Sequence, residues 1–192
     1  MALWGKSDAD ESKPKWLTTA EKKEVYATAS GWVREAGSSW SGNGNTSAQA
    51  EVLACIGSLS TDIGAADVTE VEWITTTADK SAGFTLSVRV RYNEAVTITG
   101  SPTLAVTNSA SSRGPHTLVY ASGTGSNELV FSLVIAAANA ATDADDVLSI
   151  AAQNILKPGG ATMKDATGTA TDSAVAISGT QGTAAGTITV VA

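Results

Sequence analysis

Hydrophobic and polar residues alternate with a period of two along most of the chain after Val68. The clearest case is residues 84–92 (FTLSVRVRY), in which every second residue is apolar. This pattern predicts a strand with one buried face and one outward face, and it places Arg89 and Arg91 on the outward face. Further strands are expected at residues 69–75, 95–99, 103–107, 117–121, 128–135, 147–151, 174–178 and 187–191.

Turn-forming residues separate these segments. Clusters of Gly, Pro, Ser and Asn lie at residues 100–102, 111–115, 122–127 and 157–160. Seven or more short strands, rich in Thr and Val and spaced by about 8 to 12 residues, are typical of an antiparallel β-sandwich. The segment 179–186 is expected to be a linker, and the strand 187–191 after it to have an edge open for a neighbour's sheet or for the chain's own first part.

The first 66 residues have a different pattern. Thr18 as N-cap and Glu21 three residues later form a capping box, which predicts a short helix that Gly31 ends. A loop rich in Ser, Gly and Asn is expected over residues 37–45. The apolar stretch 50–57 after it fits either a buried strand or half a helix, and periodicity does not separate the two.

Composition changes at the same boundary. Four of the five tryptophans lie in the first 40 residues, and these residues carry six Lys or Arg and six Asp or Glu. The whole net charge of −7 therefore belongs to residues 41–192. We expect two domains, namely a small mixed N-terminal module over residues 1–66 and an all-β domain over residues 67–192.

Composition also excludes several classes of protein. One cysteine cannot form an intrachain disulfide, and one histidine argues against a zinc cluster. The chain begins without a signal-peptide pattern, and its longest apolar run is far below the roughly 20 residues of a membrane span, so we expect a soluble protein made in a cytoplasm. The acidic balance and the scattered Lys and Arg argue against a nucleic-acid partner.

Few residues are suited to catalysis. His116 opens a predicted strand and is expected to be exposed to solvent. Cys55 lies in an apolar run without a basic neighbour, so it is expected to be a small buried hydrophobic residue and not a nucleophile. No phosphate-binding glycine motif is present, and we expect neither enzymatic activity nor a cofactor.

One carboxylate cluster is a candidate for a metal ion. Asp143, Asp145 and Asp146 stand close together in a turn, and calcium prefers several oxygen ligands of this kind. The cluster lacks a glycine for a sharp turn and a distal glutamate in register. An exposed Asx turn therefore explains the cluster better than a metal site, although both readings remain open.

Four motifs in the second domain resemble a known family. They are YNEAVTITGSPTL at 92–104, YASGTGSNELVF at 120–131, DADDVLSI at 143–150 and GGATMKDATG at 159–168. In this order they are similar to segments of bacterial and phage immunoglobulin-like repeat domains of the cadherin-like type. The resemblance implies an immunoglobulin-like β-sandwich. The sequence departs from the family's pattern at two places that bear on an ion site, since Asp146 stands where that family usually has glycine and Gly168-Thr169 where it has Gly-Asn.

The first 60 residues resemble a different set of proteins, the small virion structural proteins of marine cyanobacterial phages with contractile tails. The resemblance is carried by Trp4-Gly5, SKPKWL at 12–17, GWV at 31–33 and EVLACIGSL at 51–59. It implies that the N-terminal module belongs to a phage particle and that the joined sandwich is a displayed domain. Such domains occur on capsid decoration proteins, tail tubes and fibres.

The N-terminal tryptophans are the candidate partner-binding residues. A module of about 60 residues rich in Gly and Ser has little other apolar material, and each large aromatic side chain buries about 150–250 Å². Trp4, Trp16, Trp32 and Trp40 are therefore either the core of this module or anchors for a partner. Trp4, near the start of the chain, is the strongest candidate for insertion into a partner.

The sequence and the two resemblances together predict a non-enzymatic capsid decoration protein. Its N-terminal module would bind the major capsid protein or another virion protein and stabilise the assembled shell. A component of the neck, tail or fibre is the alternative within the same class. A host-surface or glycan adhesion module is the alternative from another class, and Phe84 and Tyr92 on the predicted core face count against it. Self-association and weak contact with cell-surface glycans are compatible with these readings, and a membrane partner is not expected.

Overall fold

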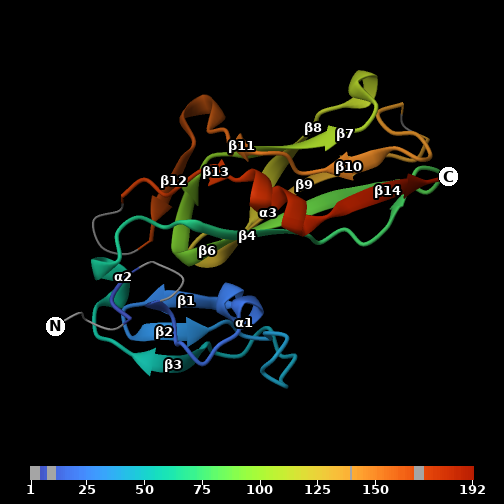
Figure 1. Ribbon diagram of the computed structural model, residues 1–192. Helices are drawn as coiled ribbons and strands as arrows, with labels where there is room; N and C mark the ends of the chain where they lie inside the picture. Colours follow the sequence, from blue (N-terminus) through green and yellow to red (C-terminus); the bar gives the residue numbers. More distant parts are fainter. Residues whose placement is uncertain (1–4, 8–11, 139, 167–170) are drawn as a thin grey trace.

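The computed structural model describes residues 5–7, 12–138, 140–166 and 171–192 (Figure 1). The protein is mainly β, as the alternating pattern predicts. Its first part contains α1 (Thr19–Lys23), β1 (Val25–Thr28), β2 (Gly31–Arg34), β3 (Glu51–Cys55) and α2 (Leu59–Asp62). Its second part contains β4 (Val68–Trp73), β5 (Ala78–Asp79), β6 (Phe84–Thr99), β7 (Thr103–Asn108), β8 (His116–Ser122), β9 (Ser126–Ile135), β10 (Val147–Ser149), β11 (Gln153–Asn154), β12 (Thr162–Asp165), β13 (Ala176–Ile177), α3 (Gly179–Ala185) and β14 (Thr187–Val191), with 3₁₀ turns at Ser111–Arg113 and Pro158–Gly160.

The capping box at the start of α1 forms as predicted. The Glu21 backbone N–H donates to Thr18 Oγ1 at 3.3 Å, and the Thr18 N–H donates to the Glu21 carboxylate at 2.7 Å. The helix ends at Lys23 and not at Gly31, because the following residues pair as the antiparallel hairpin β1–β2. Gly31 begins β2, where its φ of +130° and the close approach of β3 both require a glycine.

Residues 50–57 resolve to a strand and not to half a helix. β3 pairs antiparallel with β2, and β2 pairs with β1. The expected burial is wrong, because Glu51, Val52 and Cys55 are exposed and only Leu53 and Ala54 are partly covered. β3 is the last strand of this three-stranded unit, and no other strand among the described residues pairs with its outer edge.

The long strand β6 organises the second part. The predicted alternation is confirmed, since Leu86, Val88, Val90 and Tyr92 are fully buried. The strands predicted at 84–92 and 95–99 form one strand of 16 residues, which continues through a buried polar stretch at Asn93. The other predicted strands of this part are present with ends within two residues of the expected ones.

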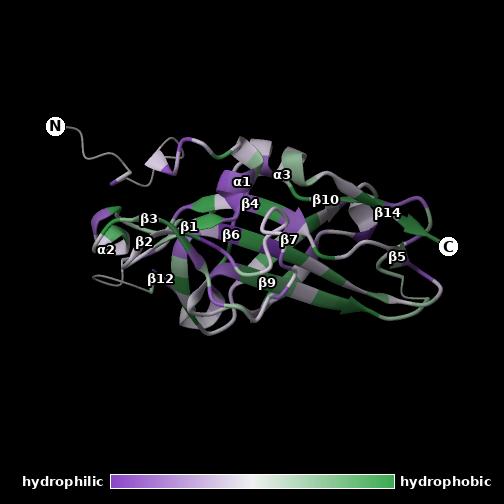
Figure 2. Ribbon diagram, turned by 90° about the horizontal axis from the view of Figure 1, so that it is seen from below, coloured by the Kyte–Doolittle hydropathy of each residue, from purple (hydrophilic) through white to green (hydrophobic). Residues whose placement is uncertain are grey.

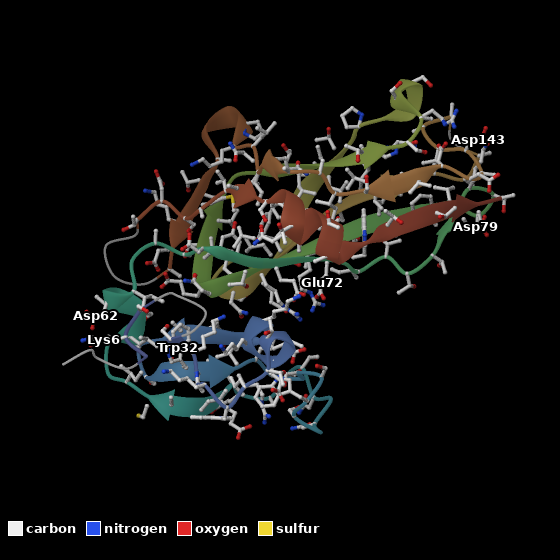
Figure 3. All side chains as sticks on the ribbon, in the orientation of Figure 1. Lys6, Trp32, Asp62, Glu72, Asp79 and Asp143 are labelled. Carbon is white, nitrogen blue, oxygen red and sulfur yellow. The ribbon has the colours of Figure 1, made fainter. Side chains whose placement is uncertain are left out.

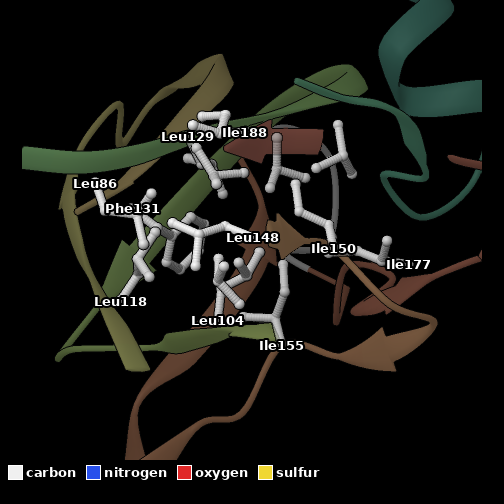
Figure 4. Close-up of a cluster of buried hydrophobic side chains, with 14 of the residues drawn as sticks. Leu86, Leu104, Leu118, Leu129, Phe131, Leu148, Ile150, Ile155, Ile177 and Ile188 are labelled. Carbon is white, nitrogen blue, oxygen red and sulfur yellow. The ribbon is translucent and has the colours of Figure 1, made fainter. Parts of the chain in front are cut away.

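The strands of the second part enclose one core. Their hydrogen-bonded path runs β6-β9-β8-β7-β10-β14-β5, and β4 and β12 also pair with β6. Strands from both ends of this path direct side chains into the same cluster (Figure 4), so the sheet curves around it. Labelled members of this core are Leu86, Leu104, Leu118, Leu129, Phe131, Leu148, Ile150, Ile155, Ile177 and Ile188.

Two expectations about the C-terminal end are wrong. The segment 179–186, expected to be a linker, contains helix α3, which Ser178 and Gln181 start with a second capping box. The strand 187–191, expected to have an open edge, lies between β10 and β5 and pairs with both. Pairing with a neighbour through β14 is therefore blocked by the fold itself.

A second, smaller core lies inside the N-terminal module. Its fully buried members come from the segment before α1, from β1, from β2 and from α2 with its C-cap, and they are Leu17, Val25, Ala27, Trp32, Leu59 and Ile63. The module packs against one end of the outward face of β4, β6 and β9 (Figure 1). Seen from the module's side, the strands β6 and β9 extend well beyond it (Figure 2).

Arg91 joins the two parts. The sequence places it on the outward face of β6, and it does point outward, but the N-terminal module covers it so that only 7% is exposed. Its guanidinium donates to Glu128 on β9 at 2.8 Å, to Glu70 on β4 at 3.0 Å and to Glu35 after β2 at 2.9 Å. Three strands and the module thus meet at one buried cation.

Further charges complete this cluster. Arg89 lies 3.0 Å from Glu72 and 3.2 Å from Glu128, and Lys23 of α1 lies 2.6 Å from Glu70. Cross-strand register explains the arrangement, because Glu70 stands opposite Arg91 and Glu72 opposite Arg89. Opposite charges in directly facing positions stabilise a sheet, and the module buries Arg91 while Arg89 and Glu72 stay partly exposed. Glu72 lies at the boundary between the two parts (Figure 3).

Replacing Gly31 with alanine tests the close packing of β2 and β3. An added Cβ would lie 2.0 Å from the Ala54 carbonyl oxygen, in a backbone region that L residues rarely adopt. We expect Gly31→Ala to lower the free energy of unfolding by at least ~2 kcal/mol in urea titration. Gly57→Ala is the matched control, because nothing lies within 4 Å of its added Cβ. Equal stability of the two variants would contradict this packing.

Candidate partner-binding surface

Trp32 belongs to the core of the N-terminal module. Its ring is fully buried, and its indole N–H donates to the Gly5 carbonyl oxygen at 2.8 Å. Lys13 lies beside it, with its ammonium 5.8 Å from the ring centroid and 2.8 Å from the Lys22 carbonyl oxygen. Of the two roles that the sequence leaves open for Trp32, the structure therefore assigns it the core, where a partner cannot reach it.

Trp40 has an intermediate position. Its ring packs partly against the small core, and the Arg34 guanidinium lies 4.4 Å from its centroid. Arg34 also forms an ion pair with Glu51 on β3. A cation held over an aromatic face stabilises the loop that carries the ring, so Trp40 ties the 37–45 loop to β2.

Trp16 is the predicted anchor that remains accessible. Its side chain is 65% exposed, and it lies in the turn that leads into α1. Trp4 lies outside the described residues. A large exposed aromatic residue is costly to leave in water, and such residues are enriched at the centres of protein interfaces. Trp16 is thus the described tryptophan best placed to bind a partner.

The open edge of β3 is the second accessible feature of the module. Among the described residues, β2 is the only strand that pairs with β3. Figure 1 shows β3 on the side of the module that faces away from the second part. Val52 on this strand is 50% exposed. The edge therefore offers unpaired backbone groups next to apolar side chains.

His116 and Cys55, the two residues considered for catalysis, both differ in burial from what the sequence predicts. His116 is buried and not exposed as expected, with Nε2 3.4 Å from Asn108 Nδ2, and burial lowers its pKa. Cys55 is exposed and not buried as expected, because β3 is an edge strand. Neither residue lies in a group of potential metal ligands within the part of the chain that the structure describes.

Within the described residues, Asp143, Asp145 and Asp146 do not form a group that could hold a metal ion. Asp146 accepts hydrogen bonds from Arg113 Nε at 2.8 Å and Asn108 Nδ2 at 2.9 Å, and the Arg113 guanidinium holds its pKa well below the usual range. Asp143 instead pairs with Lys80 of the β5 segment. Asp143 and Asp146 thus neutralise cations of the protein itself, and Asp146 also accepts a hydrogen bond from the Asp143 N–H in the turn before β10.

A polar cleft of about 390 Å³ lies where the two parts meet. Glu35 lines it together with Glu24, Glu72, Arg89 and Glu128. Asn127 donates to Glu35 at 3.3 Å, in addition to Arg91 on its other oxygen. Burial dominates over the attraction of Arg91 and raises the pKa of Glu35 to about 7. The junction therefore contains a carboxyl group that titrates near neutral pH.

Sequence reasoning did not identify the β3 edge or the Arg91 cluster as sites. The alternation of β6 indicates that Arg91 points outward, but only the packing of the module shows that it is buried. The apolar run at β3 was ambiguous because a strand and half a helix have the same composition over so few residues. The requirement for glycine at position 31 comes from the close approach of β3, which is a contact between distant segments.

No family model matches the chain, and comparisons with curated proteins and with solved structures find no match. No described helix has both the length and the apolar character that crossing a membrane requires.

Stability should depend on pH through Glu35. Its pKa of about 7 in the folded protein exceeds the ordinary value of 4.5, so the folded state holds this proton more tightly than the unfolded chain. The free energy of unfolding should therefore fall as pH rises from 4.5 to 7, by ~1–3 kcal/mol for this group. Urea titration at pH 5 and pH 8 measures the effect.

Glu35→Gln should remove this part of the pH dependence, because the amide does not titrate. Glu51→Gln is the matched control, since Glu51 is an exposed glutamate with a surface ion pair. The control variant should retain the wild-type difference between pH 5 and pH 8. If Glu35→Gln also retained it, the assignment of this titration to Glu35 would be wrong.

Proposed function

We propose that this protein is a non-enzymatic structural component of a phage particle, and that it is a capsid decoration protein. Residues 1–66 attach it to the major capsid protein or another virion protein, and residues 67–192 project outward. The proposal rests on a difference between the two parts in which aromatic side chains are exposed. The small module exposes a large aromatic side chain, Trp16, whereas Tyr92 and Phe131 of the larger part are buried in its core.

The junction supports this arrangement. A displayed domain keeps a fixed direction only where its connection to the attachment module resists bending. Here Arg91 connects β4, β6 and β9 to Glu35 of the module, and Lys23 of α1 pairs with Glu70. The far end of the second part, marked by Asp79 and Asp143, lies distant from the module (Figure 3).

We also infer that residues 67–192 form an immunoglobulin-like sandwich. One half of the hydrogen-bonded path contains β6, β9 and β8, with β4 paired to β6 beside the path. The other half contains β7, β10, β14 and β5, of which β5 pairs parallel with β14. Both halves contribute buried residues to a single core. Two layers of antiparallel strands over one core are typical of this architecture.

The glycan-adhesion alternative has less support. Sugar-binding surfaces rely on exposed aromatic rings, and the aromatic residues of the second part are turned inward. Tyr92 and Phe131 are fully buried, and Tyr120 packs edge-to-face on Phe131 with ring centroids 6.1 Å apart. Trp73 is half-buried, with its N–H donating to the Gly186 carbonyl oxygen at 3.2 Å.

Cryo-electron microscopy of intact particles, compared with particles that lack the protein, tests the proposed location. Density distributed over the icosahedral shell is the result expected of a decoration protein. Density confined to the neck, tail or fibres would overturn decoration and favour the alternative within the same class. Absence of the protein from purified particles would overturn both.

The attachment role of Trp16 predicts a specific loss of binding. Trp16→Ala should weaken binding to particles that lack the protein by about 10- to 100-fold, because buried tryptophans dominate interface energies. Its melting temperature should stay near that of the wild type, since the ring is mostly exposed in the free protein. Val134→Ala is the matched control, being 75% exposed on β9. Unchanged binding of Trp16→Ala would contradict the role.

A further inference from the structure

The structure closes most of its sheet edges, and it closes them in different ways. The outer edge of β4 is covered by α3, whose Gln181 side chain donates to the Val68 carbonyl oxygen at 2.8 Å. Residues 171–173 hydrogen-bond along the outer edge of β12. β5 has only two residues. Covering or shortening an edge prevents unwanted pairing with another chain.

β3 lacks these protections within the part of the chain that the structure describes. It is five residues long, it contains neither lysine nor proline, and no described segment pairs with its outer edge. Its central residues, Val52, Leu53 and Ala54, are apolar. An uncovered edge of this composition readily pairs with another strand.

The sequence of β3 is compatible with pairing to itself. In an antiparallel pair centred on Leu53, each Leu53 faces its copy and each Val52 faces Ala54 of the other chain. Glu51 then faces Cys55, so the two carboxylates lie at opposite ends of the pair and no like charges meet. Apolar residues in directly facing positions stabilise such a pair, whereas facing like charges would destabilise it.

We propose that β3 pairs antiparallel with β3 of a second copy of this chain, centred on Leu53. The pairing extends an established sheet, because β3 already continues through β2 and β1 toward β6. Since β3 lies on the side of the module away from the second part (Figure 1), the two larger parts would point in opposite directions from the shared strands. The proposal does not depend on which partner Trp16 binds.

The area buried between the two β3 strands determines how tightly the two copies should associate. Two five-residue strands bury much less than the roughly 800 Å² per partner of a stable complex, so the dimer is expected to be weak and concentration-dependent. Sedimentation velocity should show a mass that rises from 19.3 kDa toward twice that value as the concentration increases. A constant monomer mass up to millimolar concentration would overturn the proposal.

The variant Val52→Lys tests whether two copies of the chain associate through the edge of β3. A charged residue on the edge opposes pairing, and Val52 is exposed enough for the fold to accept it. The variant should associate at least 10-fold more weakly than the wild type. Val134→Lys, with the same change on the exposed face of β9, should associate like the wild type. Association that survives Val52→Lys, or that Val134→Lys removes, would show that another surface is used.

Cysteine pairing tests the register without relying on stability. In the proposed pair, Glu51→Cys faces the native Cys55 of the other chain at a Cβ separation of about 4.5–5.5 Å, close to the range that a disulfide spans. Val52→Cys faces Ala54 instead. With oxidised glutathione as oxidant, Glu51→Cys should yield several-fold more disulfide-linked dimer than Val52→Cys. Equal or reversed yields would overturn the register.

Discussion

The structure depends on the neutralisation of one buried cation. Arg91 cannot lie 7% exposed between the two parts unless carboxylates meet it there, since an unpaired buried charge is far more costly than a paired one. Glu70 and Glu128 come from neighbouring strands, but Glu35 comes from the N-terminal module. The module is therefore part of the environment that makes this position of β6 stable, and the two parts constrain each other.

This constraint gives the molecule two differentiated ends. The module presents Trp16 and the open edge of β3, and the second part extends away from it with its aromatic residues inside. The proposed attachment at one end and display at the other rest on that arrangement. The charge balance at the junction depends on pH near neutrality, because the pKa of Glu35 is about 7.

Local patterns in the sequence predicted most of the fold. Alternation located the strands because each has one face in the core, and the Thr18–Glu21 capping box located α1 because its hydrogen bonds are local. Features that depend on contacts between distant segments were missed. His116 and Cys55 exchanged their expected environments, and β14 lost its expected open edge to pairing with β5. The tryptophan imbalance predicts candidate residues in the N-terminal module, but only packing separates the buried Trp32 from the exposed Trp16.

Hydrogen exchange of the intact protein, measured by mass spectrometry in increasing urea, tests the coupling most directly. The amides of β2 and those of β6 belong to different cores, and Arg91 links them. If the two parts are coupled through Arg91, both sets of amides open in one cooperative step, with the same free energy and the same dependence on urea. Opening of β2 at a clearly lower free energy, while β6 stays protected, would show that the module folds independently and that the Arg91 cluster does not join the two parts.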